Sequence, residues 1–277
     1  MDMLRLDMLH PIVSGNKWFK LRLNLAYAED NGFKTLLTFG GGFSNHLVAT
    51  AFAARMHGVK SVGIVRGKYN VLTPTLQDCV NYGMQLIFVT KEDYNNKHEP
   101  TWLKGLVDQF DELYIIPEGG ANERGRAGAG LIDRYISDKY THIVTAVGSG
   151  TTLAGLRNRL KAEQRILGFA PFKDGQYLVS HINEHVVEDK RQAWQLFDNW
   201  HVGGFGKWNA GLIDFMNDFY NQNKVPLDII YTGKMMLGMQ QLLADNFFSS
   251  SNKVLCIHSG GLQGNISVKD KLIYQVP

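Results

Sequence analysis

The chain has 277 residues, of which 44% are hydrophobic and 20% charged, enough to bury one large core or two closely packed ones. Its 29 Lys and Arg against 26 Asp and Glu leave a net charge of +3 without a basic block, which argues against nucleic acid or an anionic membrane as partner and favours a small anionic ligand. No stretch approaches the roughly 20 apolar residues of a membrane-spanning helix and the N-terminus lacks a signal peptide, so we expect a cytoplasmic protein.

Short apolar runs alternate with amphipathic segments of helical length from about residue 17 onward. The predicted strands cover residues 35–39, 61–66, 86–90, 113–117, 142–147, 166–170 and 253–258. The predicted helices cover residues 17–30, 45–58, 73–83, 126–136 and 151–162. Continuous apolar strands are typical of parallel sheets that helices cover on both faces, so the predicted fold class is an open α/β fold. The glycine- and charge-rich segment 118–130 is where we expect the chain to cross between two lobes.

The first motif, SGNKWFKL at 14–21, places Lys17 at the start of a helix. Burial and the positive end of the helix would both disfavour its ammonium form and give a nucleophilic amine that condenses with an aldehyde. The alternative is an ordinary exposed lysine at a helix start, and spacing alone favours that alternative. Lys17 becomes informative through the motif that follows it.

The second motif, TFGGGFSNH at 38–46, places a glycine run between an apolar strand and a helix. In a doubly wound sheet this is where the backbone and a ligand approach closely. Ser44 is either the N-cap of the helix or a reactive hydroxyl, and the sequence leaves both open. A lysine followed by such a turn suggests pyridoxal phosphate chemistry.

A second glycine run, VGSGTTLAGL at 147–156, also links a strand to a helix. Its backbone N–H groups and the hydroxyls of Ser149, Thr151 and Thr152 are suited to a dianionic phosphate at a helix N-terminus. The run lacks the third glycine of the dinucleotide-binding fingerprint and the Lys-Ser/Thr ending of a Walker loop. A nucleotide-binding module is therefore the weaker alternative.

Two further motifs lie near the C-terminus. Tyr231 precedes a glycine and a helix in IIYTGKMM at 229–236, and Ser259 ends an apolar strand in CIHSGG at 256–261. Each side chain is placed to face a cleft, although a packed tyrosine and a turn serine are equally compatible. Cys79 and Cys256 are expected to be inert buried thiols, and we predict no disulfide and no metal site from the cysteines or the nine histidines.

Together, SGNKWFKL, GGGFSNH, VGSGTTLAG, YTGK and HSGG resemble, in this order, the 1-aminocyclopropane-1-carboxylate deaminase and D-cysteine desulfhydrase family of fold-type-II pyridoxal phosphate enzymes. The resemblance spans about residues 5–265. It implies a tryptophan-synthase-β-like fold of two open, mostly parallel lobes with pyridoxal 5′-phosphate between them. The large domain would comprise residues 1–30 plus 127–277 and the small domain residues 31–126, and the family resemblance also implies a homodimer.

The resemblance also implies roles for individual residues. Lys17 would form the Schiff base with the cofactor, Asn45 would bond its 3′-oxygen and Ser259 its pyridine nitrogen. Ser44 would touch the substrate and serve as an accessory base, beside the active-site tyrosine, Tyr231. The phosphate would be held by Lys20 together with Gly148, Ser149, Gly150, Thr151 and Thr152. The implied substrate contacts are Ser44, Asn45, His46, Phe205 and Tyr231.

Two positions favour the desulfhydrase branch of the family. Thr232 stands where ring-opening members carry a glutamate, and His46 follows the Ser-Asn pair. The expected reaction is the α,β-elimination of a small amino acid, D-cysteine giving pyruvate, ammonia and sulfide. A deaminase acting on the cyclopropane amino acid is one alternative. The other is a catalytically impaired cofactor-binding protein, because Phe205 replaces an expected second tyrosine and the N-terminal strand pair is expected to be short or absent.

Overall fold

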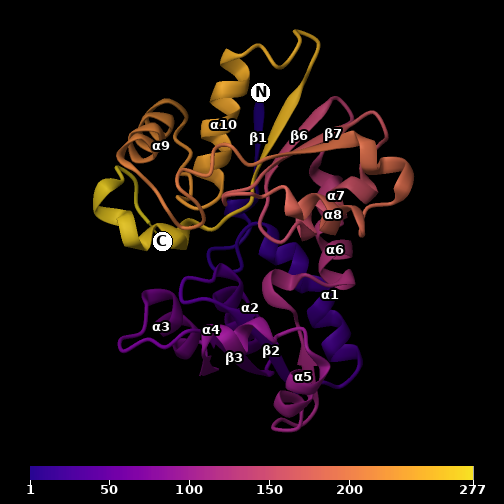
Figure 1. Cartoon of the computed structure of the whole chain (residues 1–277), viewed down its shortest axis with the longest axis vertical. Helices are drawn as coiled ribbons and strands as arrows, with labels where there is room; N and C mark the ends of the chain where they lie inside the picture. Colours follow the sequence, from indigo (N-terminus) through magenta and orange to yellow (C-terminus); the bar gives the residue numbers. More distant parts are fainter. Residues whose placement is uncertain (277) are drawn as a thin grey trace.

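A computed structural model describes residues 1–276 and contains two parallel sheets in separate lobes (Figure 1). The five-stranded sheet has the order β1-β9-β6-β7-β8, with bounds β1 Asp2–Arg5, β9 Val254–His258, β6 His142–Ala146, β7 Arg165–Phe169 and β8 Trp194–Phe197. The four-stranded sheet has the order β4-β3-β2-β5, with bounds β4 Met84–Val89, β3 Lys60–Arg66, β2 Thr35–Gly40 and β5 Leu113–Ile115. Every strand pairing in both sheets is parallel, which confirms the predicted fold class.

Helices cover the faces of both sheets (Figure 1). Their bounds are α1 Asn16–Asp30, α2 Asn45–Met56, α3 Pro74–Asn81, α4 Lys91–Asn95, α5 Pro100–Val107, α6 Glu123–Gly130, α7 Thr151–Arg159, α8 Tyr177–Asn183, α9 Ala210–Asn223 and α10 Thr232–Ala244. All five predicted helices are present, and the one expected over 126–136 is α6 followed by the short 3₁₀ helix Leu131–Tyr135. Among the helices of residues 1–276, none has both the length and the apolar character needed to cross a membrane.

All seven predicted strands are present, whereas β1 and β8 were not predicted. Both are four-residue strands at the edges of the five-stranded sheet. An edge strand is covered less fully than a central one, and these two lack the continuous apolar run from which the others were recognised. Strand β1 lies near the N-terminus and pairs with β9.

Helices α1, α6 and α7 pack backbone against backbone through glycines. A Cβ atom on Gly128 would lie 2.2 Å from the carbonyl oxygen of Phe19, and one on Gly155 would lie 2.2 Å from that of Arg126. Any larger residue would therefore force these helices apart. This packing fixes the start of α1, which carries Lys17, relative to the start of α7.

The two cysteines lie in the cores as predicted. Cys79 on α3 and Cys256 on β9 are buried and unpaired, and burial raises the pKa of each thiol to about 12. Thiols with such values stay protonated and unreactive at neutral pH.

Candidate active site

A cavity of about 1480 Å³ lies between the lobes. Its wall is formed by the segments that follow β2, β5, β6 and β9 and by the first turn of α1. Ligands of open α/β proteins bind at this carboxyl edge of the strands. The predicted site residues that line it are Lys17, Lys20, Ser44, Asn45, His46, Gly148, Ser149, Gly150, Thr152, Phe205, Tyr231 and Ser259. Thr151 does not line the cavity, but its Oγ1 lies 2.8 Å from Ser149 Oγ.

Lys17 lies in the first turn of α1, with its amino group directed to the cavity. Its Nζ donates a hydrogen bond of 2.9 Å to Asn16 Oδ1, and Asn16 Nδ2 donates one of 3.0 Å to Thr152 Oγ1. Burial lowers the pKa of Lys17 to about 8, against the opposing charge of Asp228. About a tenth of the amine is then unprotonated at pH 7 and about half at pH 8, so far more of it is available as a nucleophile than of an ordinary lysine. Asn16 and Asp228 were not among the predicted site residues.

The start of α7 has the geometry of an anion site. Its N-cap, Gly150, has φ +77°, and no side chain caps the first N–H groups of the helix. Lys20 faces the same region: it is 4% exposed, and its Nζ donates to the carbonyl oxygen of Gly119 at 3.1 Å. Burial, and then the charge of Lys17, hold the pKa of Lys20 well below its usual range. An anion in contact with Lys20 would offset that cost.

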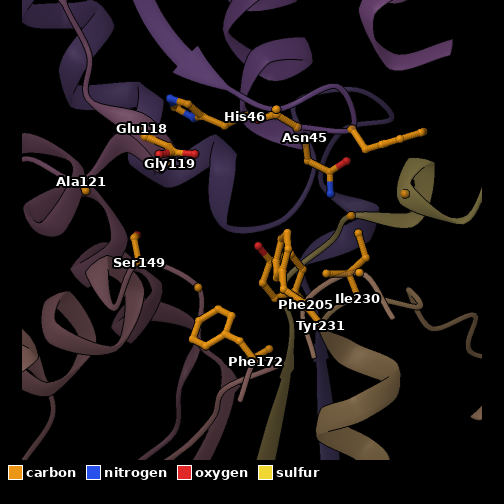
Figure 2. A pocket seen from close by; sticks show the side chains of 18 of the residues that line it. Asn45, His46, Glu118, Gly119, Ala121, Ser149, Phe172, Phe205, Ile230 and Tyr231 are labelled. Atoms are coloured by element: carbon orange, nitrogen blue, oxygen red, sulfur yellow. The ribbon is translucent and has the colours of Figure 1, made fainter. Parts of the chain in front are cut away.

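The start of α2 is capped by its own chain. Ser44 Oγ accepts a hydrogen bond of 3.3 Å from the Leu47 N–H, so the proton of the hydroxyl remains free. Asn45 Oδ1 is buried without a partner among residues 1–276. Figure 2 shows Asn45 reaching into the cavity, with Tyr231 and Phe205 on the other side. A buried amide oxygen without a partner is costly unless a ligand or water satisfies it.

His46 is a buried neutral donor rather than a cation. Thr38 Oγ1 donates its only proton to the Ile116 carbonyl oxygen at 2.7 Å, so it must accept from His46 Nε2 at 3.0 Å. Burial, and then the charges of Lys17 and Lys20, hold the pKa of His46 well below its usual range.

Tyr231 is the N-cap of α10, and its ring contacts Phe205 edge-on with centroids 5.9 Å apart. Burial, and then the charge of Asp228, raise the pKa of the Tyr231 hydroxyl. This hydroxyl therefore stays protonated at neutral pH and can donate a proton but not accept one as a phenolate. Phe205 is 55% exposed and supplies no hydroxyl to the wall.

Asp228 is fully buried and uses its charge to begin α10. Its carboxylate accepts hydrogen bonds from the N–H groups of Ile230, Tyr231 and Thr232 at 2.7–3.0 Å. The Thr232 hydroxyl donates to the same carboxylate at 2.6 Å. The carboxylate nearest the Tyr-Thr pair is thus saturated by its own chain.

Glycines make the cavity wall beside Ser259 flat. Gly261 has φ +96°, and a Cβ atom there would lie 3.0 Å from Asn45 Nδ2. The Ser259 carbonyl oxygen accepts from the Asn16 N–H at 3.2 Å, which ties this wall to α1. Flat glycine walls permit a planar ring to lie against the backbone.

The cavity is strongly positive. Among the described residues that line it, Glu118 is the one carboxylate, and it pairs with Lys97 at 3.6 Å. The basic side chains that line it are Lys17, Lys20, Arg66, Lys68, Lys91 and Lys97. Such a field attracts anions, which agrees with the predicted small anionic ligand.

These features fit pyridoxal 5′-phosphate. An amine of lowered pKa suits its aldehyde, the uncapped start of α7 with Lys20 suits its phosphate, and the flat wall beside Asn45 suits its ring. A family model described as "Pyridoxal-phosphate dependent enzyme" matches residues 3–260. The chain belongs to this family. The chain is therefore a member of an enzyme family that depends on pyridoxal phosphate.

Curated relatives and solved structures agree with this pyridoxal phosphate family. A Thermotoga maritima protein with the provisional name 1-aminocyclopropane-1-carboxylate deaminase is 28% identical over 96% of this chain and 90% of its own. An Arabidopsis thaliana protein named bifunctional D-cysteine desulfhydrase/1-aminocyclopropane-1-carboxylate deaminase, mitochondrial, is 27% identical over 94% of this chain and 72% of its own. These relatives carry the two family names that the motifs predicted.

A crystal structure described as an ACC deaminase homologue superposes with a TM-score of 0.84, at 28% identity over 98% of this chain and 87% of that one. A crystal structure of a bacterial threonine deaminase superposes with a TM-score of 0.61 at 18% identity, over 88% of this chain and 82% of that one, and shows the shared fold only.

One prediction needs correction outside the catalytic centre. We expected no metal-ligating cluster, yet the structure brings His181, Glu184 and His185 together at the end of α8. The sequence signal was present, because HINEH at 181–185 places the two histidines one helical turn apart.

Proposed function

We propose that the protein catalyses the α,β-elimination of a small D-amino acid with a β leaving group, with D-cysteine as the named substrate. In this reaction D-cysteine and one water give pyruvate, ammonia and hydrogen sulfide. The observation that carries the proposal is Ser259, which lines the cavity with a neutral hydroxyl where it would face the pyridine nitrogen, while Asp228 is saturated by the start of α10. A hydroxyl cannot hold that nitrogen protonated as a carboxylate can, which favours β-elimination over cyclopropane ring opening.

The bound cofactor would withdraw electrons from the substrate Cα and so acidify its proton. Lys17, once freed by the substrate amine, would remove that proton through Nζ. Its pKa of about 8 suits this task, because a general base works best when its pKa lies near the operating pH. Asn16 holds Nζ by a hydrogen bond and keeps it directed at the cavity.

We propose that the cofactor is held at both ends. Lys20 and the loop of Gly148, Ser149, Gly150, Thr151 and Thr152 would bind the phosphate. Asn45 would bond the 3′-oxygen and Ser259 the pyridine nitrogen. Support comes from the unpartnered Asn45 amide oxygen, the buried Lys20 and the uncapped start of α7.

We propose that the substrate contacts Ser44, Asn45, His46, Phe205 and Tyr231. The Ser44 hydroxyl, whose proton is free, can donate a hydrogen bond to the substrate carboxylate. After it has lost that proton, Ser44 Oγ can serve as an accessory base. Tyr231 stays protonated because burial raises its pKa, so it would act as a donor. Phe205 offers an apolar edge to the β substituent.

A 1-aminocyclopropane-1-carboxylate deaminase is the second candidate, supported by the names of the relatives. It would produce 2-oxobutanoate and ammonia. Thr232, which stands where ring-opening members carry a glutamate, argues against it.

The test uses holoenzyme loaded with pyridoxal phosphate and offers D-cysteine, L-cysteine, β-chloro-D-alanine and the cyclopropane amino acid in parallel. Pyruvate from D-cysteine and β-chloro-D-alanine, with sulfide from D-cysteine, is the expected result. Release of 2-oxobutanoate alone would favour the second candidate. No keto acid from any β-substituted D-amino acid by the loaded enzyme would overturn the proposal.

We further propose the domain boundaries implied by the resemblance, residues 1–30 plus 127–277 and residues 31–126. They agree with the distribution of strands, since β2 to β5 form one sheet and all other strands form the second. A homodimer and a cytoplasmic location stay predictions.

A further inference from the structure

The end of α8 gathers three potential metal ligands on one helical turn. One ligand atom from each of His181, Glu184 and His185 lies within 4.8 Å of the others. His181 Nδ1 is 3.6 Å from Glu184 Oε2, and the two imidazole rings are 5.2 Å apart at their centroids. Among the described residues, no other group of histidines, cysteines and carboxylates brings three ligand atoms this close together.

We propose that His181, Glu184 and His185 bind a divalent transition-metal ion, with Zn²⁺ as the representative. Two imidazoles and a carboxylate are the donor set that Zn²⁺ accepts, with metal–ligand bonds of about 2.0–2.2 Å. Bonds of that length place the donor atoms about 3 Å from one another. The ligand atoms now lie within 4.8 Å of one another, and changes of side-chain rotamer would bring them closer. His181 and Glu184 side chains are 49% and 66% exposed and are free to make such changes.

The backbone beneath the three ligands is already fixed. The carbonyl oxygen of His185 accepts a hydrogen bond of 2.8 Å from Asn158 Nδ2, and Val187 N–H donates to Asn158 Oδ1 at 3.0 Å. Asn183 Oδ1 accepts from the Trp194 indole N–H at 3.0 Å. A fixed backbone limits the conformational entropy lost on binding to that of the side chains.

A charged side chain beside the cluster provides a further test. Arg126 lines a second cavity of about 440 Å³ together with Glu184 and His185. The positive charge of Arg126 would repel a cation. We therefore expect Arg126→Gln to tighten binding, an effect that a purely structural role of the cluster does not produce.

The proposed site lies at the wall of the catalytic cavity. His181 lines that cavity, while Glu184 and His185 line the second cavity. Ile182, between the ligands, occupies the space next to Gly150, where a Cβ atom would lie 2.5 Å from its Cγ1. A bound ion would thus be one side chain away from the start of α7, with coordination positions left open to solvent.

The experiment is a calorimetric titration of the holoenzyme with Zn²⁺ alone in a non-chelating buffer. We expect one equivalent of Zn²⁺ to bind. Loss of a side chain that only supports a metal ligand weakens binding by roughly 10- to 100-fold, so His181→Ala and His185→Ala should each weaken it by at least that factor. The matched control is His57→Ala, which removes an exposed histidine 3.8 Å from a lone carboxylate, Glu29, and should leave the affinity unchanged.

Absence of saturable Zn²⁺ binding, or binding that neither His181→Ala nor His185→Ala weakens, would overturn the proposal. Circular dichroism of each variant checks that the fold is intact. Since the readout is binding, the result does not depend on which amino acid the enzyme consumes.

Discussion

Two strand-to-helix turns face the cavity from opposite lobes and differ in one respect. The turn before α2 is closed by the Ser44 side chain, which accepts the Leu47 N–H. The turn before α7 has glycine at the N-cap and leaves its N–H groups without a side-chain acceptor. A side-chain cap satisfies one of the free donors at a helix start, whereas an uncapped start leaves that donor to an anion or water. The comparison supports our proposal that the phosphate binds at α7 and that the substrate and the cofactor ring contact α2.

The largest expected effect concerns the α2 turn. Ser44→Ala removes both the cap and the hydroxyl, and we expect kcat for β-elimination to fall by about 10²-fold or more, in the range for acid–base groups. The lost cap should also cost about 1 kcal/mol of unfolding free energy. Steady-state kinetics and urea unfolding measure the two effects.

Two further variants at this position separate the cap from the chemistry. Ser44→Asn keeps a capping oxygen but no hydroxyl, so stability should return without activity. Ser44→Thr keeps both and should retain much of each. Full activity in Ser44→Asn would show that the hydroxyl does no chemistry.

The second prediction concerns the α7 turn. Gly150→Ala places a side chain at φ +77° with a Cβ atom 2.5 Å from Ile182 Cγ1, so the loop must shift. Strain of about 1–3 kcal/mol at this turn corresponds to roughly 5- to 150-fold weaker cofactor binding. Equilibrium titration of apoprotein with pyridoxal phosphate measures it.

Gly83→Ala is the matched control, because Gly83 also has a positive φ, of +87°, a Cβ atom there meets nothing within 4 Å, and the residue does not line the cavity. Its cofactor affinity should equal that of the unmodified protein. Equal affinities for Gly150→Ala and the unmodified protein would argue against the assignment of phosphate to α7.

The third prediction concerns the pH dependence of cofactor loading. Burial lowers the pKa of Lys17 to about 8, and only its unprotonated amine attacks an aldehyde. The rate of loading should therefore rise about tenfold per pH unit below 8 and level off above it. Stopped-flow absorbance from pH 6 to about 10 tests this, and a rate that continues to climb to pH 10 would mean an ordinary lysine.

The smallest expected effect is at the edge of the cavity. Phe205→Tyr adds a hydroxyl to an exposed ring that contacts Tyr231, without changing its packing. We expect kcat/KM for D-cysteine to change by a few-fold at most, since a hydrogen bond of typical strength contributes about 1 kcal/mol. A gain of several hundred-fold would instead show that Phe205 had impaired the enzyme.

The sequence predicted the central strands because each is a continuous apolar run bounded by turn residues, as residues 35–39 and 253–258 illustrate. It did not predict β1 and β8, whose edge positions need no such run. It also identified the loops that line the cavity, since glycine and hydroxyl residues are concentrated where strands end.

Three features of the site differ in how far the sequence could reveal them. Asn16 accepts a hydrogen bond from Lys17 and donates one to Thr152, which lies 136 positions further along the chain. No local sequence pattern predicts the bond to Thr152. The hydrogen bonds that the start of α10 donates to Asp228 depend on the geometry of the turn, which the sequence does not show. The cluster of His181, Glu184 and His185, by contrast, has a local signal, because its two histidines are one helical turn apart in the sequence.

The most direct test of the account is the absorbance of the purified protein between about 300 and 550 nm, beside a Lys17→Ala variant, before and after addition of D-cysteine. We predict a visible band that is absent from Lys17→Ala, that shifts with D-cysteine and that accompanies pyruvate release. A colourless protein that cannot be reconstituted with pyridoxal phosphate, or a band that shifts in Lys17→Ala as in the unmodified protein with equal pyruvate release, would contradict it.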